Sequence, residues 1–342
     1  MTQKSVLVTG AAGYIGTHVL LALSEAGYQC LPLDNYCNSS PVAIRRAQEL
    51  GANIIAPLNL DVRDQPALER LVQSNVIDSV IHLAGLKSVA ESGAKPLDYY
   101  GNNVAGSMSL LRALQGSGVR KFVFSSSATV YGLPKVLPYT EDAELRPANV
   151  YGRTKLMVEE ILGDLASSAP DWKIARLRYF NPVGAHPSGR IGEDPRGQPN
   201  NLMPIICRVA AGRQERLQVY GRDYPTRDGT CIRDFIHVMD LAEGHVAALS
   251  ALEGVPPGRT LTVNLGTGRG HTVEEVVQAF EHANAVSIPR EYAARRAGDI
   301  PEYYADCGLA ERVMSWRAKR GLDEMCRDAW RWQERNPSGY GE

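Results

Sequence analysis

The stretch Ser5–Gly16, with the sequence SVLVTGAAGYIG, decides the fold of this chain. Its first five residues contain an apolar run with β-branched residues, which predicts a short buried strand. Gly10, Gly13 and Gly16 follow at once, and the apolar pattern after them predicts a helix that ends at Gly27. Glycine lets the backbone turn tightly and approach phosphates, and the helix N-terminus presents free N–H groups. The stretch therefore predicts a turn that binds the pyrophosphate of a dinucleotide.

The spacing of these glycines is G-x-x-G-x-x-G, which differs from the G-x-G-x-x-G of many dehydrogenases. A glycine-rich turn without a ligand is the alternative interpretation. The next predicted strand, residues 29–33, ends at Asp34, where a carboxylate would bind the adenosine ribose hydroxyls. Because an anion there repels a 2′-phosphate, Asp34 favours NAD over NADP. An Asp at a strand end can also be a simple turn residue.

Tyr151 and Lys155 form a second informative pair, downstream of the three serines 125–127. Positions i and i+4 share one face of a helix, so the Lys155 ammonium can lie near the Tyr151 phenol. A free tyrosine titrates near pH ~10, and a nearby cation favours its phenolate. Lowering that pKa by roughly 3 units needs about 4 kcal/mol, which one lysine and a cationic nicotinamide ring can supply. The pair beside a dinucleotide turn predicts an oxidoreductase site.

Length and composition indicate a globular protein of about two domains. The chain has 342 residues, of which 44% are hydrophobic and 22% are charged. Its net charge of −1 offers no basic patch for nucleic acid, and its cysteines and histidines show no metal-ligand spacing. No apolar stretch reaches membrane-spanning length, and residues 1–4 leave no room for a signal peptide. We expect a soluble cytoplasmic protein that binds no metal, nucleic acid or membrane.

Predicted strands and helices alternate through the first half of the chain, which is typical of an α/β fold with a Rossmann-type doubly wound parallel sheet. After Asp34 the predicted strands are 53–56, 79–83, 121–124 and 173–178. The predicted helices are 66–72, 97–114 and 151–165.

Glycines and prolines interrupt the pattern between residues 181 and 204, which indicates a substrate-binding region. Segments resembling the first half then return, with runs at 230–238 and 262–265 on either side of a predicted helix, 240–252. We therefore predict an NAD-binding domain of residues 1–180 with returning segments near 230–265. A smaller, interleaved C-terminal domain, mainly residues 181–342, would bind the substrate.

Longer motifs extend over essentially the whole chain. They include VTGAAGYIG at 8–16, VIHLAGLK at 80–87, FSSSATVYG at 124–132, LRYFNPVGAH at 177–186, PNNLMP at 199–204, RDFIHV at 233–238 and RRAGD at 295–299. On these motifs the chain resembles the UDP-galactose (UDP-glucose) 4-epimerases, members of the extended short-chain dehydrogenase/reductase family. The motifs of the second half are far more specific than the glycine turn.

The resemblance implies a tightly bound NAD, a UDP-sugar substrate and a homodimer. Tyr151 would be the catalytic acid/base, and Lys155 would bind the nicotinamide ribose and tune the phenol. Ser127 would hydrogen-bond the sugar 4-oxygen, unless it only caps the backbone at a strand end. Lys87 matches a position that contacts cofactor and substrate, and a solvated surface lysine is its alternative interpretation.

The remaining matches fall into two groups. Positions that match cofactor contacts are Gly10, Gly13, Tyr14, Ile15, Gly16, Asp34, Asn35, Asn38, Ser39, Asp61, Val62, Leu83, Ala84, Gly85, Lys87, Asn102, Ser125, Tyr151, Lys155 and Tyr179. Positions that match UDP-sugar contacts are Lys87, Ser127, Tyr151, Asn181, Asn201, Leu202, Gln218, Tyr220, Arg233, Arg296, Asp299 and Tyr303. Arginines inside such motifs suit a diphosphate, because the guanidinium fork binds it bidentately.

The implied reaction interconverts UDP-glucose and UDP-galactose. Hydride would pass from the sugar C4 to NAD⁺, the 4-ketose would rotate in the site, and hydride would return to its opposite face. A 4-epimerase for UDP-N-acetylglucosamine and UDP-N-acetylgalactosamine differs only in pocket size, and Tyr303 is bulky where it would crowd an acetamido group. A nucleotide-sugar 4,6-dehydratase needs an Asp-Glu pair after the active-site serine, and residues 127–129 contain no carboxylate. An NAD-sensing protein of the same fold would lack Tyr151 or Lys155.

Overall fold

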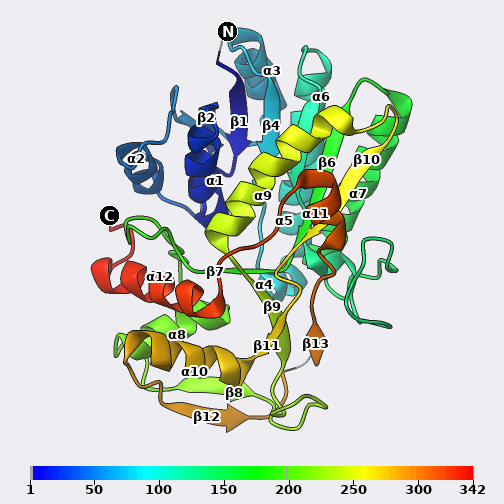
Figure 1. Cartoon of the computed structure of the whole chain (residues 1–342). Coiled ribbons are helices and arrows are strands. Elements are labelled where there is room, and N and C mark those ends of the chain that lie inside the picture. The colour runs from blue at the N-terminus through cyan, green and yellow to red at the C-terminus, as the bar shows by residue number, and fades with distance from the viewer. Residues whose placement is uncertain (1–2, 198, 297, 342) are drawn as a thin grey trace.

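The computed structural model describes residues 3–341 apart from residues 198 and 297, so Met1, Thr2 and Ala297 of the RRAGD motif lie outside the described residues. Figure 1 shows a larger upper part, built around a sheet with helices on both faces, and a smaller lower part. Within the described residues, no helix is long and apolar enough to cross a bilayer.

The larger part contains a seven-stranded sheet in the order β10-β6-β5-β4-β1-β2-β3. All its pairings are parallel, so the predicted doubly wound α/β fold is confirmed. Its strands are β1 (Ser5–Thr9), β2 (Gln29–Asp34), β3 (Leu58–Asn59), β4 (Ser79–His82), β5 (Lys121–Ser125), β6 (Lys173–Tyr179) and β10 (Thr260–Leu265).

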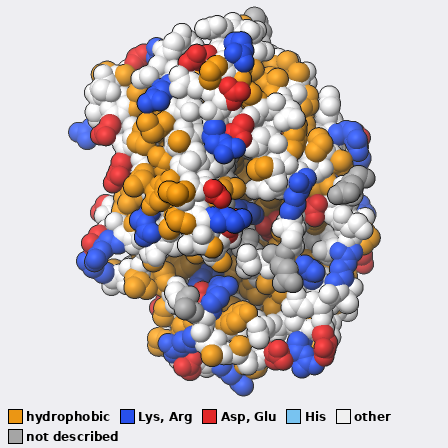
Figure 2. All heavy atoms as spheres, turned by 180° about the vertical axis from the view of Figure 1, so that it is seen from behind, with side chains coloured by type: hydrophobic (Ala, Val, Ile, Leu, Met, Phe, Trp, Pro, Cys, Tyr) orange, Lys and Arg blue, Asp and Glu red, His pale blue; other side chains and the backbone are white. Residues whose placement is uncertain are grey.

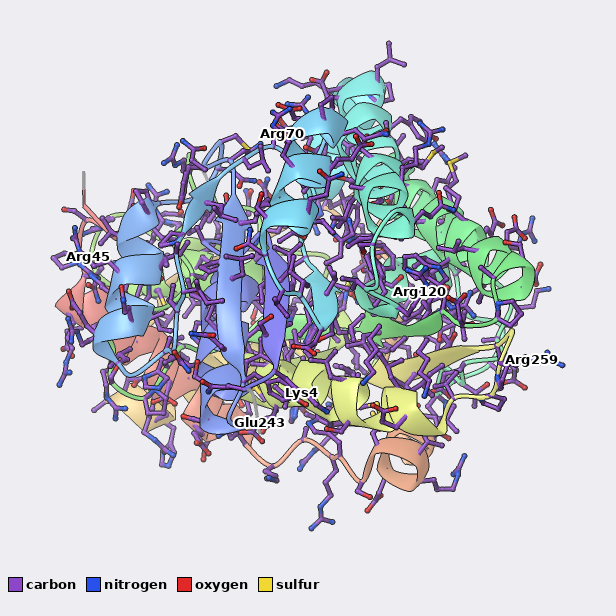
Figure 3. All side chains as sticks on the ribbon, turned by 90° about the horizontal axis from the view of Figure 1, so that it is seen from above. Lys4, Arg45, Arg70, Arg120, Glu243 and Arg259 are labelled. Carbon is purple, nitrogen blue, oxygen red and sulfur yellow. The ribbon has the colours of Figure 1, made fainter. Side chains whose placement is uncertain are left out.

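Two hydrophobic cores form on the two faces of this sheet, because successive strand residues point to opposite sides. Val6 and Val8 of β1 pack in one core with α1 (Tyr14–Glu25), α2 (Pro41–Glu49) and α9 (Val238–Ala251). Leu7 packs in the other core with α3 (Gln65–Ser74), α6 (Gly106–Gln115) and α7 (Val150–Ser168). In Figure 3, Arg70 on α3 and Glu243 on α9 lie on opposite sides of the sheet.

The smaller part has a four-stranded sheet, a two-stranded sheet and a core of its own. The first sheet holds β7 (Asn181–Val183), β9 (Ile232–His237), β11 (Gly270–Thr272) and β13 (Glu302–Tyr303), and the second pairs β8 (Leu217–Tyr220) with β12 (Arg290–Ala293). The helices of its core are α8 (Leu202–Ala210), α10 (Val273–Asn284) and α12 (Leu322–Arg335).

The chain returns to the large sheet once, late in the sequence. β10 pairs with β6, and α9 packs against α1, as the pattern after residue 238 predicts. The strand predicted at 230–238 differs, because β9 pairs with β7, β11 and β13 in the smaller sheet. The division into residues 1–180 and 181–342 stays a prediction.

Two predicted elements of the first half take another form. The strand predicted at 53–56 is wrong, because Ile54 makes only one bridge and Ile55 is 44% exposed just before Pro57. The strand that pairs with β2 at this edge of the sheet is instead β3. The helix predicted at 97–114 is interrupted: α5 (Pro96–Tyr99) continues into a π-helical turn, Tyr100–Ala105, before α6 begins. Such turns often occur at functional sites, and this one borders the site described next.

Candidate active site

The strand order of the large sheet reverses between β1 and β4, and ligands of doubly wound sheets bind at such a switch point. Gly10 follows β1 with a positive φ of 70°, and a Cβ on it would lie 2.7 Å from the backbone nitrogen of Ala84. A Cβ on Gly16 would lie 2.2 Å from the carbonyl oxygen of Gly10. The predicted glycine turn and the predicted segment 83–85 therefore touch, and only glycine allows this approach.

The helix after the turn suits an anion. Gly13 is the N-cap of α1 and provides no side-chain cap, and the first turn holds no acidic residue. The first N–H groups of a helix have no partner within it, so those of Tyr14 and Ile15 can donate to a pyrophosphate. The Tyr14 hydroxyl donates to the carbonyl of Gly184 at 2.7 Å, which joins the turn to the segment after β7.

Asp34 lies at the end of β2 with only 6% of its surface exposed. Its Oδ2 accepts a hydrogen bond from the Ala12 backbone at 2.9 Å, and its Oδ1 accepts from Tyr36 N and Ser39 Oγ at 2.9 and 2.8 Å. The carboxylate thus holds the glycine turn and the loop after β2 together. Since each carboxylate oxygen has about two acceptor positions, one position on Oδ2 is left for a ribose hydroxyl.

Four further predicted cofactor contacts lie near Asp34 in the sequence or the fold. Asn35 donates to Asp61 Oδ2 at 2.8 Å, and Arg63 pairs with the same carboxylate at 2.7 Å. Hydrogen bonds from Arg63 hold the pKa of Asp61 well below its usual range. Val62 is buried, whereas Asn38 is exposed.

Beyond β4, Asn103 fixes the loop that carries Gly85 and Lys87. Its Oδ1 accepts from Leu86 N at 2.8 Å and from the predicted contact Asn102 at 3.0 Å, and its Nδ2 donates to Leu86 O and Thr154 Oγ1. The π-helical turn thereby aligns this loop with α7. The neighbouring Asn102 was predicted as a site residue, whereas Asn103 was missed.

Lys87 is 59% exposed and donates to Glu193 Oε1 at 3.0 Å. Asn201 donates to the same oxygen at 3.3 Å, so one carboxylate joins a predicted cofactor contact to a predicted UDP contact. Sequence reasoning missed Glu193. No signal marks it, because it lies in the glycine- and proline-rich segment 181–204, where no periodicity sets a face.

Tyr151 and Lys155 lie in the first two turns of α7, and both are buried, with 7% and 5% of their surface exposed. Asn149 caps the helix by accepting from the Gly152 backbone, which fixes where the helix begins. Lys155 Nζ donates to the Ser125 carbonyl at 2.7 Å and lies 5.9 Å from the Tyr151 ring centre. The predicted pair therefore shares one helix face at the end of β5.

Ser127 caps the backbone at the strand end, and its predicted contact with the sugar 4-oxygen stays a prediction. Its Oγ accepts hydrogen bonds from the backbone nitrogen and hydroxyl of Thr129, at 3.2 and 3.0 Å, so it does cap a short helical turn. Because the hydroxyl only accepts in these bonds, its own proton stays free to donate. Ser127 also lowers the pKa of Tyr151, so the two hydroxyls lie close together.

The protein's own groups shift the pKa of Tyr151 in the direction opposite to that expected. Burial raises it to about 12, and Ser127 only partly offsets this. Burial also lowers the pKa of Lys155 to about 8, so its ammonium loses its proton more easily than that of a free lysine. A phenolate at neutral pH therefore requires additional positive charge, which is what a bound NAD⁺ carries at its nicotinamide ring.

Ser125 and Tyr179 lie behind this pair. The Ser125 hydroxyl donates to His245 Nε2 at 2.6 Å, because His245 Nδ1 donates to the Leu241 carbonyl at 2.8 Å and leaves Nε2 as the acceptor. Tyr179 packs against the His245 ring at 6.2 Å. The Ser125 carbonyl therefore accepts a hydrogen bond from Lys155, while the Ser125 hydroxyl is bound to His245 on α9.

Tyr303 lies near Tyr151 from the other part of the molecule, because the ionised form of Tyr303 would add to the effect of burial, which raises the pKa of Tyr151. Its hydroxyl donates to Asn181 Oδ1 at 2.8 Å, and the Arg233 guanidinium lies 4.8 Å from its ring centre. Arg233 also lies 3.9 Å from Asp299. The structure thus brings together four of the predicted UDP-sugar contacts near Tyr151.

The other predicted UDP contacts lie farther out. Arg296 is 56% exposed, donates to Asp299 at 2.9 Å and lies 5.6 Å from the Tyr220 ring centre. Gln218 and Tyr220 are exposed on β8, and Leu202 is the first residue of α8. No group of three or more His, Cys, Asp or Glu side chains suited to a metal ion occurs among the described residues.

The geometry, a dinucleotide turn next to a buried tyrosine and lysine, agrees with the family whose model matches residues 6–266. The chain belongs to the NAD dependent epimerase/dehydratase family. The predicted dependence on NAD is thereby confirmed. A UDP-glucose 4-epimerase of Cyamopsis tetragonoloba is 54% identical over 344 residues, covering 100% of this chain and 98% of that protein.

Solved structures agree over the whole length. The UDP-glucose 4-epimerase of Stenotrophomonas maltophila, with NAD and formylated UDP-arabinopyranose bound, matches with a TM-score of 0.95 and 48% identity over 98% of this chain and 99% of that one. The enzyme of Bifidobacterium longum, in complex with NAD⁺ and UDP, matches with a TM-score of 0.93 and 47% identity over 98% and 100%. The resemblance to UDP-glucose 4-epimerases is confirmed.

Proposed function

We propose that this chain is an NAD-dependent isomerase that interconverts UDP-glucose and UDP-galactose. The observation that carries the proposal is the buried pair of Tyr151 and Lys155 at the end of β5, beside the glycine turn and opposite Tyr303. Full-length similarity to UDP-glucose 4-epimerases supports it. A 4,6-dehydratase is disfavoured, because the segment after Ser127 holds no carboxylate to expel water.

Each residue of the pair has a defined task. Tyr151 takes the proton of the sugar 4-hydroxyl and returns it after the ketone has turned, while Ser127 donates its free proton to the 4-oxygen. Lys155, fixed by the Ser125 carbonyl, keeps positive charge beside the phenol. NAD, when bound, accepts the hydride from C4 and gives it back. Because the sugar is oxidised and reduced again, no net oxidant is consumed.

The fit for NAD rests on the uncapped start of α1, the close approach of Gly10 and Ala84, and Asp34 at the end of β2. The UDP would be held by residues of the smaller part, among which Arg233 and Arg296 suit its diphosphate. The predicted NAD contacts and the predicted UDP-sugar contacts belong to this proposal. In it, the contacts to the UDP keep the nucleotide bound while the sugar rotates.

A direct test is conversion of UDP-galactose by the purified protein without added cofactor, followed by separation of the two UDP-sugars. We expect conversion in both directions and NAD released on denaturation. A protein that retains NAD but converts neither sugar would contradict the proposal. UDP-N-acetylglucosamine, tested in parallel, distinguishes the alternative 4-epimerase.

We also propose a homodimer that works in the cytoplasm. Val89 on α4 (Val89–Ala94), Leu97 on α5 and Met157 on α7 are 48%, 82% and 40% exposed, and these three helices pack together. Figure 2 shows hydrophobic side chains gathered on the face seen from behind. Exposed apolar surface of this kind suits a subunit contact. Light scattering of the wild type and of Leu97→Asp tests it, and a wild-type monomer would contradict it.

A further inference from the structure

Glu159 lies one helical turn after Lys155 on α7 and is only 1% exposed. Buried carboxylates are rare unless they are paired, so its partners show what it does. It accepts from Ser126 Oγ at 2.5 Å and from the Arg178 guanidinium, with Nη2 at 2.6 Å. Arg178 is itself 3% exposed.

Ser126 is the centre of the segment that builds the site. Its two neighbours are Ser125, whose carbonyl holds Lys155, and Ser127, which lies beside Tyr151. The bond from Ser126 to Glu159 therefore ties the end of β5 to the same helix that carries both catalytic side chains. A shift of Glu159 would move Ser125 and Ser127 relative to Tyr151.

We propose that Glu159 is a positioning residue for the reaction, which fixes the serine segment and supplies a negative charge one helical turn from the buried Lys155. The inference rests on the proposed function, because it concerns the same reaction. It goes beyond the cofactor and UDP-sugar contacts that the resemblance implies, since neither Glu159 nor Arg178 is among them. The sequence signal is the spacing of 151, 155 and 159, which puts all three on one helix face.

The surrounding charges agree with this role. Around Glu159 lie Lys155 from its own helix, Arg176 and Arg178 from β6, and Tyr131. The groups near Lys155 are Tyr151 and, from β4, the buried His82, whose pKa is lowered to about 3 by burial.

Burial lowers the pKa of Lys155 to about 8, and the negative charge of Glu159 acts against this change. Without Glu159 the ammonium would be lost at a lower pH. Activity that needs this cation falls as the pH rises through its pKa, so the alkaline limb of the pH profile reports on Glu159.

The variant Glu159→Gln removes the charge, but it leaves Arg178 buried without an anion, which destabilises a fold strongly. The double variant Glu159→Gln/Arg178→Gln removes both charges and allows the two amides to pair. Because Glu159 raises the pKa of Lys155 whereas Arg178 is not among the groups that shift it, we expect the alkaline limb of kcat/KM to move to lower pH in this double variant, by about 1 pH unit.

The matched control is Asp240→Asn on α9, since Asp240 is also buried and paired with an arginine, Arg320, at 2.5 Å. It should lower stability and leave the alkaline limb in place. If the double variant folds and its kcat/KM keeps the alkaline limb of the wild type, the charge of Glu159 does not act on Lys155. An inactive wild type would instead overturn the proposed function.

Ser126→Ala tests positioning separately, and it removes only one hydroxyl from the fold. We expect kcat to fall at least about fivefold, because small displacements of catalytic groups are costly, with KM and bound NAD unchanged. An unaltered kcat in Ser126→Ala overturns the positioning role, even where the charge variants do not fold.

Discussion

The two halves of the candidate site are built in different ways. On the cofactor side, Asp34, Tyr151 and Lys155 are buried at the ends of strands of a seven-stranded sheet, and backbone groups hold Asp34 and Lys155. On the nucleotide side, Tyr220 and Arg296 are 39% and 56% exposed beside a two-stranded sheet. The side chains of the first half are held by the fold itself, whereas the second half includes side chains that lie at the surface.

This difference fits the proposed chemistry. A cofactor that is regenerated in each turnover need not leave, so its half can be rigid and closed. A substrate that enters and departs in each turnover needs a half that it can reach. Asp234 links the two, because its buried carboxylate accepts from the backbones of Thr267, Gly268 and Ala305 and so holds the strand that carries Tyr303.

The largest effect should come from Tyr151→Phe, which keeps the ring and removes the ionisable oxygen. Loss of general acid/base catalysis should lower kcat by about 10²–10⁴-fold. Bound NAD should be unchanged, because the rigid half stays intact. Steady-state kinetics measure the loss of kcat, and the NAD content of the purified variant shows whether the cofactor is still bound. A variant within threefold of the wild type would remove Tyr151 from the mechanism.

Gly10→Ala should break the rigid half itself. The added methyl would lie 2.7 Å from Ala84 N at a φ of 70°, so both steric overlap and backbone strain oppose it. We expect loss of bound NAD together with a lower melting temperature.

Gly27→Ala is the matched control, because Gly27 has a φ of 85° with nothing within 4 Å of the added Cβ. It should cost about 1–2 kcal/mol of folding free energy from strain alone and keep its NAD. Equal NAD content in the two variants would show that close approach at Gly10 does not matter.

Tyr303→Cys tests the boundary between the two halves. Overfilling a packed site costs about 1–3 kcal/mol, so Tyr303 should bias the wild type roughly 5- to 150-fold against UDP-N-acetylglucosamine. The cysteine variant should accept this substrate and keep UDP-galactose turnover largely intact. Relative kcat/KM values for the two substrates measure the bias.

Tyr303→Phe keeps the ring and removes only the hydroxyl that donates to Asn181. It should therefore still exclude the N-acetylated sugar. A wild type that converts both sugars equally well would show that Tyr303 does not set the pocket size, and loop movement or Tyr304 would then have to do so.

The rigid half was also the half that the sequence predicted well. Strand Ser5–Thr9 and the glycine turn follow from β-branched periodicity and from backbone conformations that only glycine adopts. The Tyr151–Lys155 contact follows from helix spacing. Three-dimensional partners that carry no local pattern were missed, such as Glu193, which contacts Lys87 and Asn201 from a segment without periodicity.

Local patterns also failed where tertiary context decides. The apolar run at 53–56 has strand-forming residues, yet Pro57 follows and Ile55 faces outward, so the pairing moves to Leu58–Asn59. The strand Ile232–His237 directly precedes α9, which packs against α1 of the large part, and only its partners place it in the smaller sheet. The raised pKa of Tyr151 depends on burial, which the spacing of two residues does not predict.

The smallest effect should come from Lys87, which belongs to the loop after β4 but reaches across to Glu193. An exposed ion pair contributes about 0.2–1 kcal/mol, so Lys87→Met should raise KM for UDP-galactose by no more than about fivefold and leave kcat unchanged. A double-mutant cycle with Glu193→Gln measures the pair directly, since a shared contribution makes the two single effects less than additive. If Lys87→Met instead lowers kcat a hundredfold or releases NAD, Lys87 acts on the cofactor itself. Lys87 would then belong to the cofactor half although its side chain is exposed. Solvent exposure alone would no longer distinguish the cofactor half from the nucleotide half.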